Sequence, residues 1–392
     1  MMFTPALTRI NATASLENAL TPNEVKSSEN KFLLSNLGGV FVGNPYASKW
    51  KTFNFALGYN QLASFEQDFE YEGISTGSIV DRFLEQVDGD DISDFESGLA
   101  LDAIAVYDID GDGIYETDFL TNPEAQLTRS QVVTRSGSIG ELVLGLGGNY
   151  DDKLMVGFTL GIPFLSFTEN KEYEETDPND EVGFFTNLSY NENLTTTGVG
   201  INAKFGVMAL VTKQIRLGLA IHTPSMYALE DSFSTAFVYT YDDQGIISNQ
   251  AVSPSGLFDY RLRTPWRLIG GGSLVIKKAG FITTELEWVK YNTAQFNLTA
   301  NSTNPDDEEY EKELNAQINS RFRSTLNFKV GGELVLLQVL KVRAGLGLGF
   351  SPYQDEDEIN RLISIGVGYR KGRFLQTLLL EYHLSMKIIR LI

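Results

Sequence analysis

Residues 260–291 read YRLRTPWRLIGGGSLVIKKAGFITTELEWVKY. At a period of two, the period of a β-strand, this stretch separates into two faces. One face carries Leu262, Thr264, Trp266, Leu268, Gly270, Gly272, Leu274 and Ile276, and the other carries Arg261, Arg263, Arg267 and Ser273. After the turn at Lys277–Gly280 the alternation resumes, with Ile282, Thr284, Leu286 and Trp288 opposite Thr283, Glu285 and Glu287. The stretch therefore predicts a long β-hairpin with one apolar face and one charged face.

Each arm of this hairpin exceeds the roughly 5–6 residues of a usual soluble strand and suits the roughly 9–11 residues that cross a bilayer at a tilt. A soluble β-sandwich is the alternative interpretation. Sandwich strands rarely place arginines and glutamates along one continuous face, because both sheets pack on a shared apolar core. We therefore expect an all-β fold, a transmembrane antiparallel β-barrel.

The composition narrows the class of protein further. The chain has 392 residues, including 36 Gly, 17 Tyr and 25 Phe, and a mean hydropathy of −0.12, which fits a barrel whose apolar residues are diluted by alternation. The absence of cysteine excludes disulfides, thiol catalysis and cysteine metal sites. The net charge of −20 argues against nucleic acid as a partner, because no basic stripe is present to neutralise phosphates.

The connections between the expected strands alternate in length. The period-two test gives about thirteen strands in one barrel domain, 1–392. Tight turns are expected at 44–49, 151–153, 212–214, 277–280, 337–341 and 370–373, and long polar loops at 14–31, 66–127, 169–194, 234–256, 299–321 and 352–360. Short periplasmic turns and long extracellular loops are typical of the outer membrane of Gram-negative bacteria. The segment 66–127, with 18 acidic residues against the single Arg82, is expected to be an acidic extracellular loop insertion.

Some of these loops contain helix signals. Residues 79–87 show a helical apolar stripe that stops at Gly89, Ser93 and Glu96 are spaced as a capping box, and Asn304-Pro305 begins a third helical pattern. These helices either cover the loops or form an apolar surface that first receives a hydrophobic substrate.

Several stretches resemble one known family. They are Tyr260–Leu268 (YRLRTPWRL), Phe3–Leu7 (FTPAL), Phe53–Asn60 (FNFALGYN) and Leu217–Tyr227 (LGLAIHTPSMY). They resemble the FadL-type outer-membrane transporters of long-chain fatty acids and aromatic hydrocarbons, and Bacteroidetes members in particular. The resemblance implies a monomeric 14-stranded barrel, an N-terminal hatch in the lumen, and passive uptake of hydrophobic molecules with lateral exit into the bilayer. From the sequence we expect two departures from the family pattern, namely no Gly-rich hatch before the first strand and no aromatic last strand.

Six cations are candidates for binding the head group of a substrate. Alternation places them on the lumen side, among Asn202, Glu285, Glu287 and Glu333, and they are Lys204, Arg216, Arg263, Arg267, Lys329 and Arg343. Arginine is suited to clamp a carboxylate with two hydrogen bonds. The alternative is that these cations pair with carboxylates on neighbouring strands and only line the barrel.

Residues 108–116, DIDGDGIYE, match the first half of a calcium-binding loop, with candidate ligands Asp108, Asp110, Asp112 and Glu116. Position twelve of that loop, usually a bidentate Glu, is Phe119, so a complete EF-hand is not expected. The segment is either a calcium-stiffened extracellular loop or an acidic turn without a metal, and no other cofactor is required.

Enzymatic activity has little support, because only His222 and His383 are available as bases and no acid and serine are nominated beside them. The expected function is passive transport of hydrophobic small molecules such as long-chain fatty acids, with outer-membrane lipid as the surroundings. The alternative is a structural or interaction barrel, such as a scaffold subunit of a secretion system.

Overall fold

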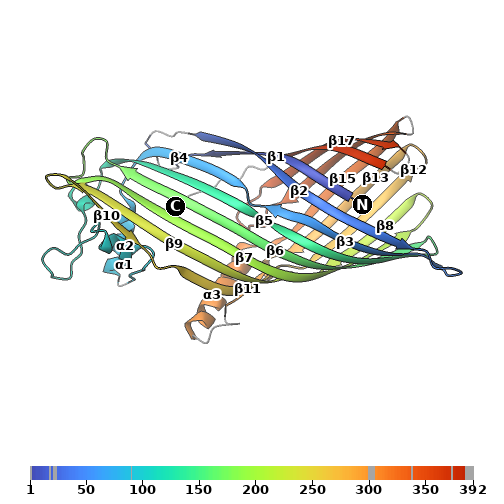
Figure 1. The fold of residues 1–392 in the computed structure, drawn as a ribbon, viewed down its shortest axis with the longest axis horizontal. Coiled ribbons are helices and arrows are strands. Elements are labelled where there is room, and N and C mark those ends of the chain that lie inside the picture. The colour runs from blue at the N-terminus through green and yellow to red at the C-terminus, as the bar shows by residue number, and fades with distance from the viewer. Residues whose placement is uncertain are drawn as a thin grey trace.

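The structure is a computed structural model that describes residues 2–16, 19–20, 24–89, 91–298, 305–336, 339–371 and 374–384. The strands form one sheet that winds into the expected β-barrel (Figure 1). They are β1 (Met2–Ala14), β2 (Val25–Gly43), β3 (Trp50–Ser64), β4 (Gln67–Thr76), β5 (Gln126–Tyr150), β6 (Leu154–Thr176), β7 (Phe185–Leu210), β8 (Ile215–His222), β9 (Met226–Asp242), β10 (Ile246–Val252), β11 (Gly256–Arg263), β12 (Arg267–Ile276), β13 (Gly280–Lys290), β14 (Gln295–Asn297), β15 (Ser324–Leu336), β16 (Leu340–Phe350), β17 (Ile359–Lys371) and β18 (Phe374–Leu384). The helices are α1 (Ile79–Asp88), α2 (Ser97–Asp102) and α3 (Pro305–Arg321), with 3-10 turns η1 (Asp118–Thr121) and η2 (Tyr291–Thr293).

The wall of the barrel is antiparallel. Its pairing order is β1–β2–β3–β5–β6–β7–β8–β12–β13–β15–β16–β17–β18. β4 continues β3 and pairs with β5, β9 continues β8 and pairs with β7, and β11 precedes β12 and pairs with β9. Counted in this way, the described residues make thirteen wall strands, as the alternation predicted.

Apolar side chains cover the outer face of the wall. On β12, Leu268, Leu274 and Ile276 are 42–46% exposed, and Leu217 and Leu219 on the neighbouring β8 are 53% and 61% exposed. Trp266 and Trp288 add aromatic rings to the same face. Because a barrel in a bilayer turns its apolar residues to lipid, this exposed band is the membrane-facing surface.

The wall is much taller on one side than on the other. β5, β6 and β7 have 25, 23 and 26 residues, whereas β12 and β13 have 10 and 11. Figure 1 shows the long strands running past the end of the shorter ones. The loops expected at 14–31, 169–194 and 234–256 were therefore predicted too long, since much of each is strand. Above the bilayer both faces of a strand meet water or other protein, so the apolar alternation ends before the backbone pairing does.

Residues 77–125, called the insertion below, carry α1, α2 and η1 at the end of the molecule where the long strands finish (Figure 1). The helix expected at 79–87 is confirmed as α1, which ends at Asp88 with Gly89 as its C-cap. The capping box predicted at Ser93 and Glu96 was wrong, because the capping box lies at Ser78 and Asp81. Ser93 Oγ instead accepts a hydrogen bond from Phe95 N, and the Glu96 carboxylate pairs with Arg82. α3 is also confirmed, although its expected cap, Asn304, lies outside the described residues.

No helix within the described residues is both long and apolar enough to cross a membrane.

Candidate functional site

A buried charged network lies on the inner face of the wall. Glu141 of β5 is fully buried, and its carboxylate accepts hydrogen bonds from Lys204 Nζ and, at 2.8 Å, from Asn202 Nδ2. Asn202 also donates to Ser225 Oγ at 3.0 Å. This network lies over Gly161 of β6, where a Cβ atom would come within 2.5 Å of Asn202 Oδ1. Gly161 is therefore the residue that gives the buried carboxylate its space.

Further ion pairs follow around the inner face. Arg267 lies 3.4 Å from Glu287, and Lys329 lies 2.9 Å from Glu285. Glu333 pairs with two cations, Lys341 at 2.7 Å and Arg343 at 2.8 Å. Four of the six predicted cations, Lys204, Arg267, Lys329 and Arg343, thus already have a carboxylate partner. A substrate carboxylate would have to displace that partner. For these four cations the structure therefore favours the alternative named in the sequence analysis, in which cations pair with carboxylates on neighbouring strands.

Arg216 of β8 differs from those four cations. It alternates with the outward Ile215 and Leu217, so it is on the inner face, and its side chain is exposed. It makes no ion pair or hydrogen bond to any residue that the structure describes. Arg216 therefore remains available to an anionic head group.

Arg263 was predicted to face the lumen, and this was wrong. It pairs with Met226, which is 61% exposed, whereas its neighbour Leu262 pairs with Tyr227, which is 7% exposed. The cause is one extra residue near Pro224. Lys204 of β7 pairs with His222, and Ile201, three residues before Lys204, pairs with Met226, which is four residues after His222. The extra residue inverts the alternation, so Leu262 faces inward and Arg263 outward.

An apolar cavity of about 430 Å³ lies against the wall where β6, β7, β8 and β12 meet. Its inner-face lining consists of Met155, Met208, Ala220, Ile269, Gly157, Gly206, Gly218 and Gly271, with Glu285 at one edge. Met155 pairs with Met208, and Gly218 pairs with both Met208 and Gly271, so the lining is continuous across four strands. Arg216 is two residues from Gly218 on the same face. The arrangement can hold an apolar chain beside an unpaired cation.

The sequence did not predict this cavity, although its signal is visible there. Glycines recur on the inner face of neighbouring strands, at Gly157, Gly206, Gly218 and Gly271. Missing side chains at adjacent inward positions leave space along the wall, but only the strand register shows that these positions adjoin.

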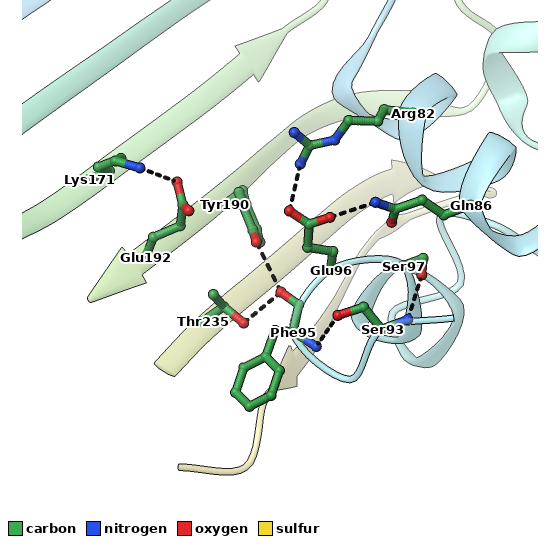
Figure 2. Close-up of polar contacts among 10 residues, drawn as sticks. All are labelled: Arg82, Gln86, Ser93, Phe95, Glu96, Ser97, Lys171, Tyr190, Glu192 and Thr235. Atoms are coloured by element: carbon green, nitrogen blue, oxygen red, sulfur yellow. Dashed lines mark hydrogen bonds and ion pairs between the residues drawn. The ribbon is translucent and has the colours of Figure 1, made fainter. Parts of the chain in front are cut away.

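The insertion packs on the inner face of the tall side of the wall. Val80, Phe83 and Leu99 share a buried core with Leu188 and Tyr190 of β7 and Phe237 and Tyr239 of β9. Leu188 and Tyr190 alternate in step with Asn202 and Lys204, which identifies their side as the lumen side. Figure 2 shows one polar anchor between the insertion and the wall: Phe95 O accepts hydrogen bonds from Tyr190 Oη at 2.9 Å and Thr235 Oγ1 at 2.7 Å.

A second anchor joins the wall to the start of α1. The side chain of Glu175, next to the last residue of β6, is completely buried and accepts hydrogen bonds from Ser78 Oγ, Ile79 N and Tyr173 Oη at 2.5, 2.9 and 2.5 Å. Arg129 Nε lies 3.5 Å away. Burial raises the pKa of Glu175, while Arg129 and these donors act in the opposite direction. A carboxylate at the first turn of a helix also complements the helix dipole.

The predicted calcium ligands are only partly brought together. Oxygens of Asp108, Asp110 and Asp112 lie within 4.8 Å of one another, whereas Glu116 is not part of this group and pairs through its backbone with Tyr107. Asp108 accepts hydrogen bonds from Gly111 N and Gly113 N, and both glycines have positive φ. The loop is thus shaped by its own side chains.

Comparison with known proteins supports the fold. No protein-family model and no curated protein sequence matches the chain. The crystal structure of a Pseudomonas aeruginosa FadL homologue matches 97% of this chain and 79% of its own, with 11% identity and a TM-score of 0.50. The Pseudomonas putida toluene transporter TodX covers 97% and 85% of the two chains, with 13% identity and a TM-score of 0.44. The first match confirms that the chain has the FadL-type barrel fold.

Proposed function

We propose that this chain is a monomeric barrel of the Gram-negative outer membrane that lets hydrophobic compounds, such as long-chain fatty acids, cross passively. The observation that carries the proposal is the apolar cavity on the inner wall with the unpaired Arg216 beside it. A mostly apolar pocket with one convergent charge is the usual design of a site for an amphipathic small molecule.

The cavity and the cation have separate roles in this proposal. Met155, Met208 and Ile269 take up an alkyl or aromatic group, since burial of apolar surface contributes about 25 cal/mol per Å². Methionine adapts to chains of different shape because it is unbranched and polarizable. Arg216 receives the carboxylate. The paired cations farther along the wall supply no free positive charge, so they leave the passage close to neutral.

We predict that Arg216→Ala lowers the flux of a long-chain fatty acid by about 5- to 20-fold and leaves the flux of its methyl ester within about twofold, because only the acid uses the charge-assisted hydrogen bond. The measurement is saturable uptake into proteoliposomes that contain the folded barrel. Lys213→Ala, which removes an exposed cation from the adjoining turn, is the matched control.

Equal loss for the acid and the ester would show that Arg216 acts on the barrel and not on the head group. A folded parent barrel that carries neither compound would overturn the transport proposal itself.

The second candidate function is a scaffold barrel that binds another protein and carries no solute. The observation that favours it is the ion pairing along the lumen together with the insertion packed inside the tall wall. Absence of flux for both compounds, with a folded barrel, is the result expected for a scaffold.

We also propose that Asp108, Asp110 and Asp112 bind one calcium ion with its remaining ligands from water. Asp110→Asn should weaken calcium binding at least tenfold in a calorimetric titration of the folded barrel, because it removes one charged ligand while the two backbone hydrogen bonds of Asp108 stay in place. Asp102→Asn, an exposed carboxylate of the same insertion, is the control. No measurable calcium binding by the parent at millimolar concentration would contradict the site.

A further inference from the structure

The outward position of Arg263 places two arginines on the lipid side of the wall. Arg261 and Arg263 are on the face of β11 opposite Tyr260 and Leu262, whose partners on β9, Leu229 and Tyr227, are buried. Lys290 adds a third cation nearby, because it alternates with the outward Leu286 and Trp288 at the end of β13. These three residues are called the cationic patch below.

The height of the cationic patch follows from the apolar band beneath it. On β12 and the residue before it, the band runs from Trp266 to Ile276. Eleven residues rising about 3.3 Å each, tilted by about 45°, span about 25 Å, which is the height of the apolar band of an outer-membrane barrel. Arg263 and Lys290 therefore lie at the end of the hydrocarbon layer on the extracellular side, where the head groups of the outer leaflet begin.

None of the three members of the cationic patch has an ion pair or hydrogen bond from its charged group to a described residue, and Arg263 Nε is buried without a partner. On the inner face, by contrast, Lys204, Arg267, Lys329 and Arg343 each have a carboxylate partner. On the same outer face, the carboxylates Asp259 and Glu230 occupy the paired positions next to Arg261 and Ala228. Glu311 of α3 accepts hydrogen bonds from Leu298 N and from Asn297, the strand partner of Arg261.

From these observations we infer that the cationic patch binds a phosphate group on the head group of an outer-leaflet glycolipid. Guanidinium groups match phosphate oxygens with two parallel hydrogen bonds, and tryptophans such as Trp266 and Trp288 favour the membrane interface just below. In a chain with a net charge of −20, such local cations favour contact with an anionic leaflet. The inference rests on the outer-membrane location in the proposed function, but it does not depend on transport.

The test compares two double variants that remove the same number of charges at opposite ends of the wall. Arg261→Ala/Arg263→Ala removes cations at the extracellular end, and Lys277→Ala/Lys278→Ala removes them at the opposite turn. The barrel is reconstituted in nanodiscs, and binding of a bis-phosphorylated lipid A is measured by native mass spectrometry. At roughly fivefold per cation, the arginine variant should lose about 25-fold in affinity and the lysine variant less than threefold. Adding Lys290→Ala should cost about fivefold more.

Three further arms separate the possible outcomes. Dephosphorylated lipid should bind the parent and the arginine variant equally, and inorganic phosphate at millimolar concentration should not displace the intact lipid. Equal affinity of the parent and the arginine variant for the phosphorylated lipid would overturn the inference, as would an equal loss in the lysine variant. Uptake of the fatty acid methyl ester is measured on the same samples, so failure of lipid binding and failure of transport are read separately.

Discussion

Glu175→Ala should release α1 from the wall while the barrel itself stays folded. The substitution leaves Ser78 Oγ, Ile79 N and Tyr173 Oη without their shared acceptor. Each buried polar group left without a partner costs about 1–3 kcal/mol. Hydrogen exchange of the α1 amides, followed by mass spectrometry, should accelerate on the order of a hundredfold or more, because local opening sets the exchange rate.

Glu174→Ala is the matched control, since Glu174 is the neighbouring residue and is exposed. It should leave the exchange of α1 within about twofold. Unchanged α1 protection in Glu175→Ala would show that the apolar core of Phe83 and Leu99 holds the insertion without the anchor.

The same residue predicts a pH dependence with a definite sign. Burial raises the pKa of Glu175 above its ordinary value of 4.5, so the docked insertion holds this proton more tightly than the released one. The stability that this proton gives to the docked insertion is fully present below pH 4.5, and it is lost as the pH rises through the pKa of Glu175 in the docked state. After correction for intrinsic exchange rates, opening of α1 should increase with pH in the parent and stay level in Glu175→Gln.

The second large effect is expected from Gly161→Ala. The new methyl group overlaps the Glu141 carboxylate and comes within 2.5 Å of Asn202 Oδ1, so the buried pair of Glu141 and Lys204 has to move apart. A disrupted buried ion pair costs about 3–5 kcal/mol. The folded yield and the urea midpoint, measured by the mobility shift of the unheated barrel on gels, should both fall clearly.

Gly157→Ala provides the comparison on the same strand and the same face. A Cβ atom there has Leu146 O as its nearest neighbour, at 3.8 Å, so this variant should fold like the parent. If Gly161→Ala also folded like the parent, the buried network would have to be able to rearrange at little cost.

Much of the barrel could be predicted from sequence because alternation is a local property. The outward residues Leu268, Leu274 and Trp288 were placed correctly from their spacing alone. The prediction failed for Arg263, because a single extra residue near Pro224 moves the following side chains to the opposite face of the sheet. An offset of one residue cannot be recognised from the composition of the sequence.

The site was harder to predict for the same physical reason. Lys204 and Glu141 are separated by 63 residues, so their pairing depends on how strands are aligned, and the sequence does not state that alignment. Glu175 was missed because it lies within 169–194, which was expected to be a loop, and a glutamate in a loop is ordinarily solvated.

The two hydrogen bonds to Phe95 O have a consequence for the order of folding. Their donors, Tyr190 and Thr235, lie 95 and 140 residues later in the chain. The insertion therefore cannot complete its core until β7 and β9 have paired, and closing such long loops is entropically slow. In refolding experiments, burial of Phe83 and Tyr190 should thus lag behind the formation of sheet, so that the end of the barrel that carries the insertion closes last.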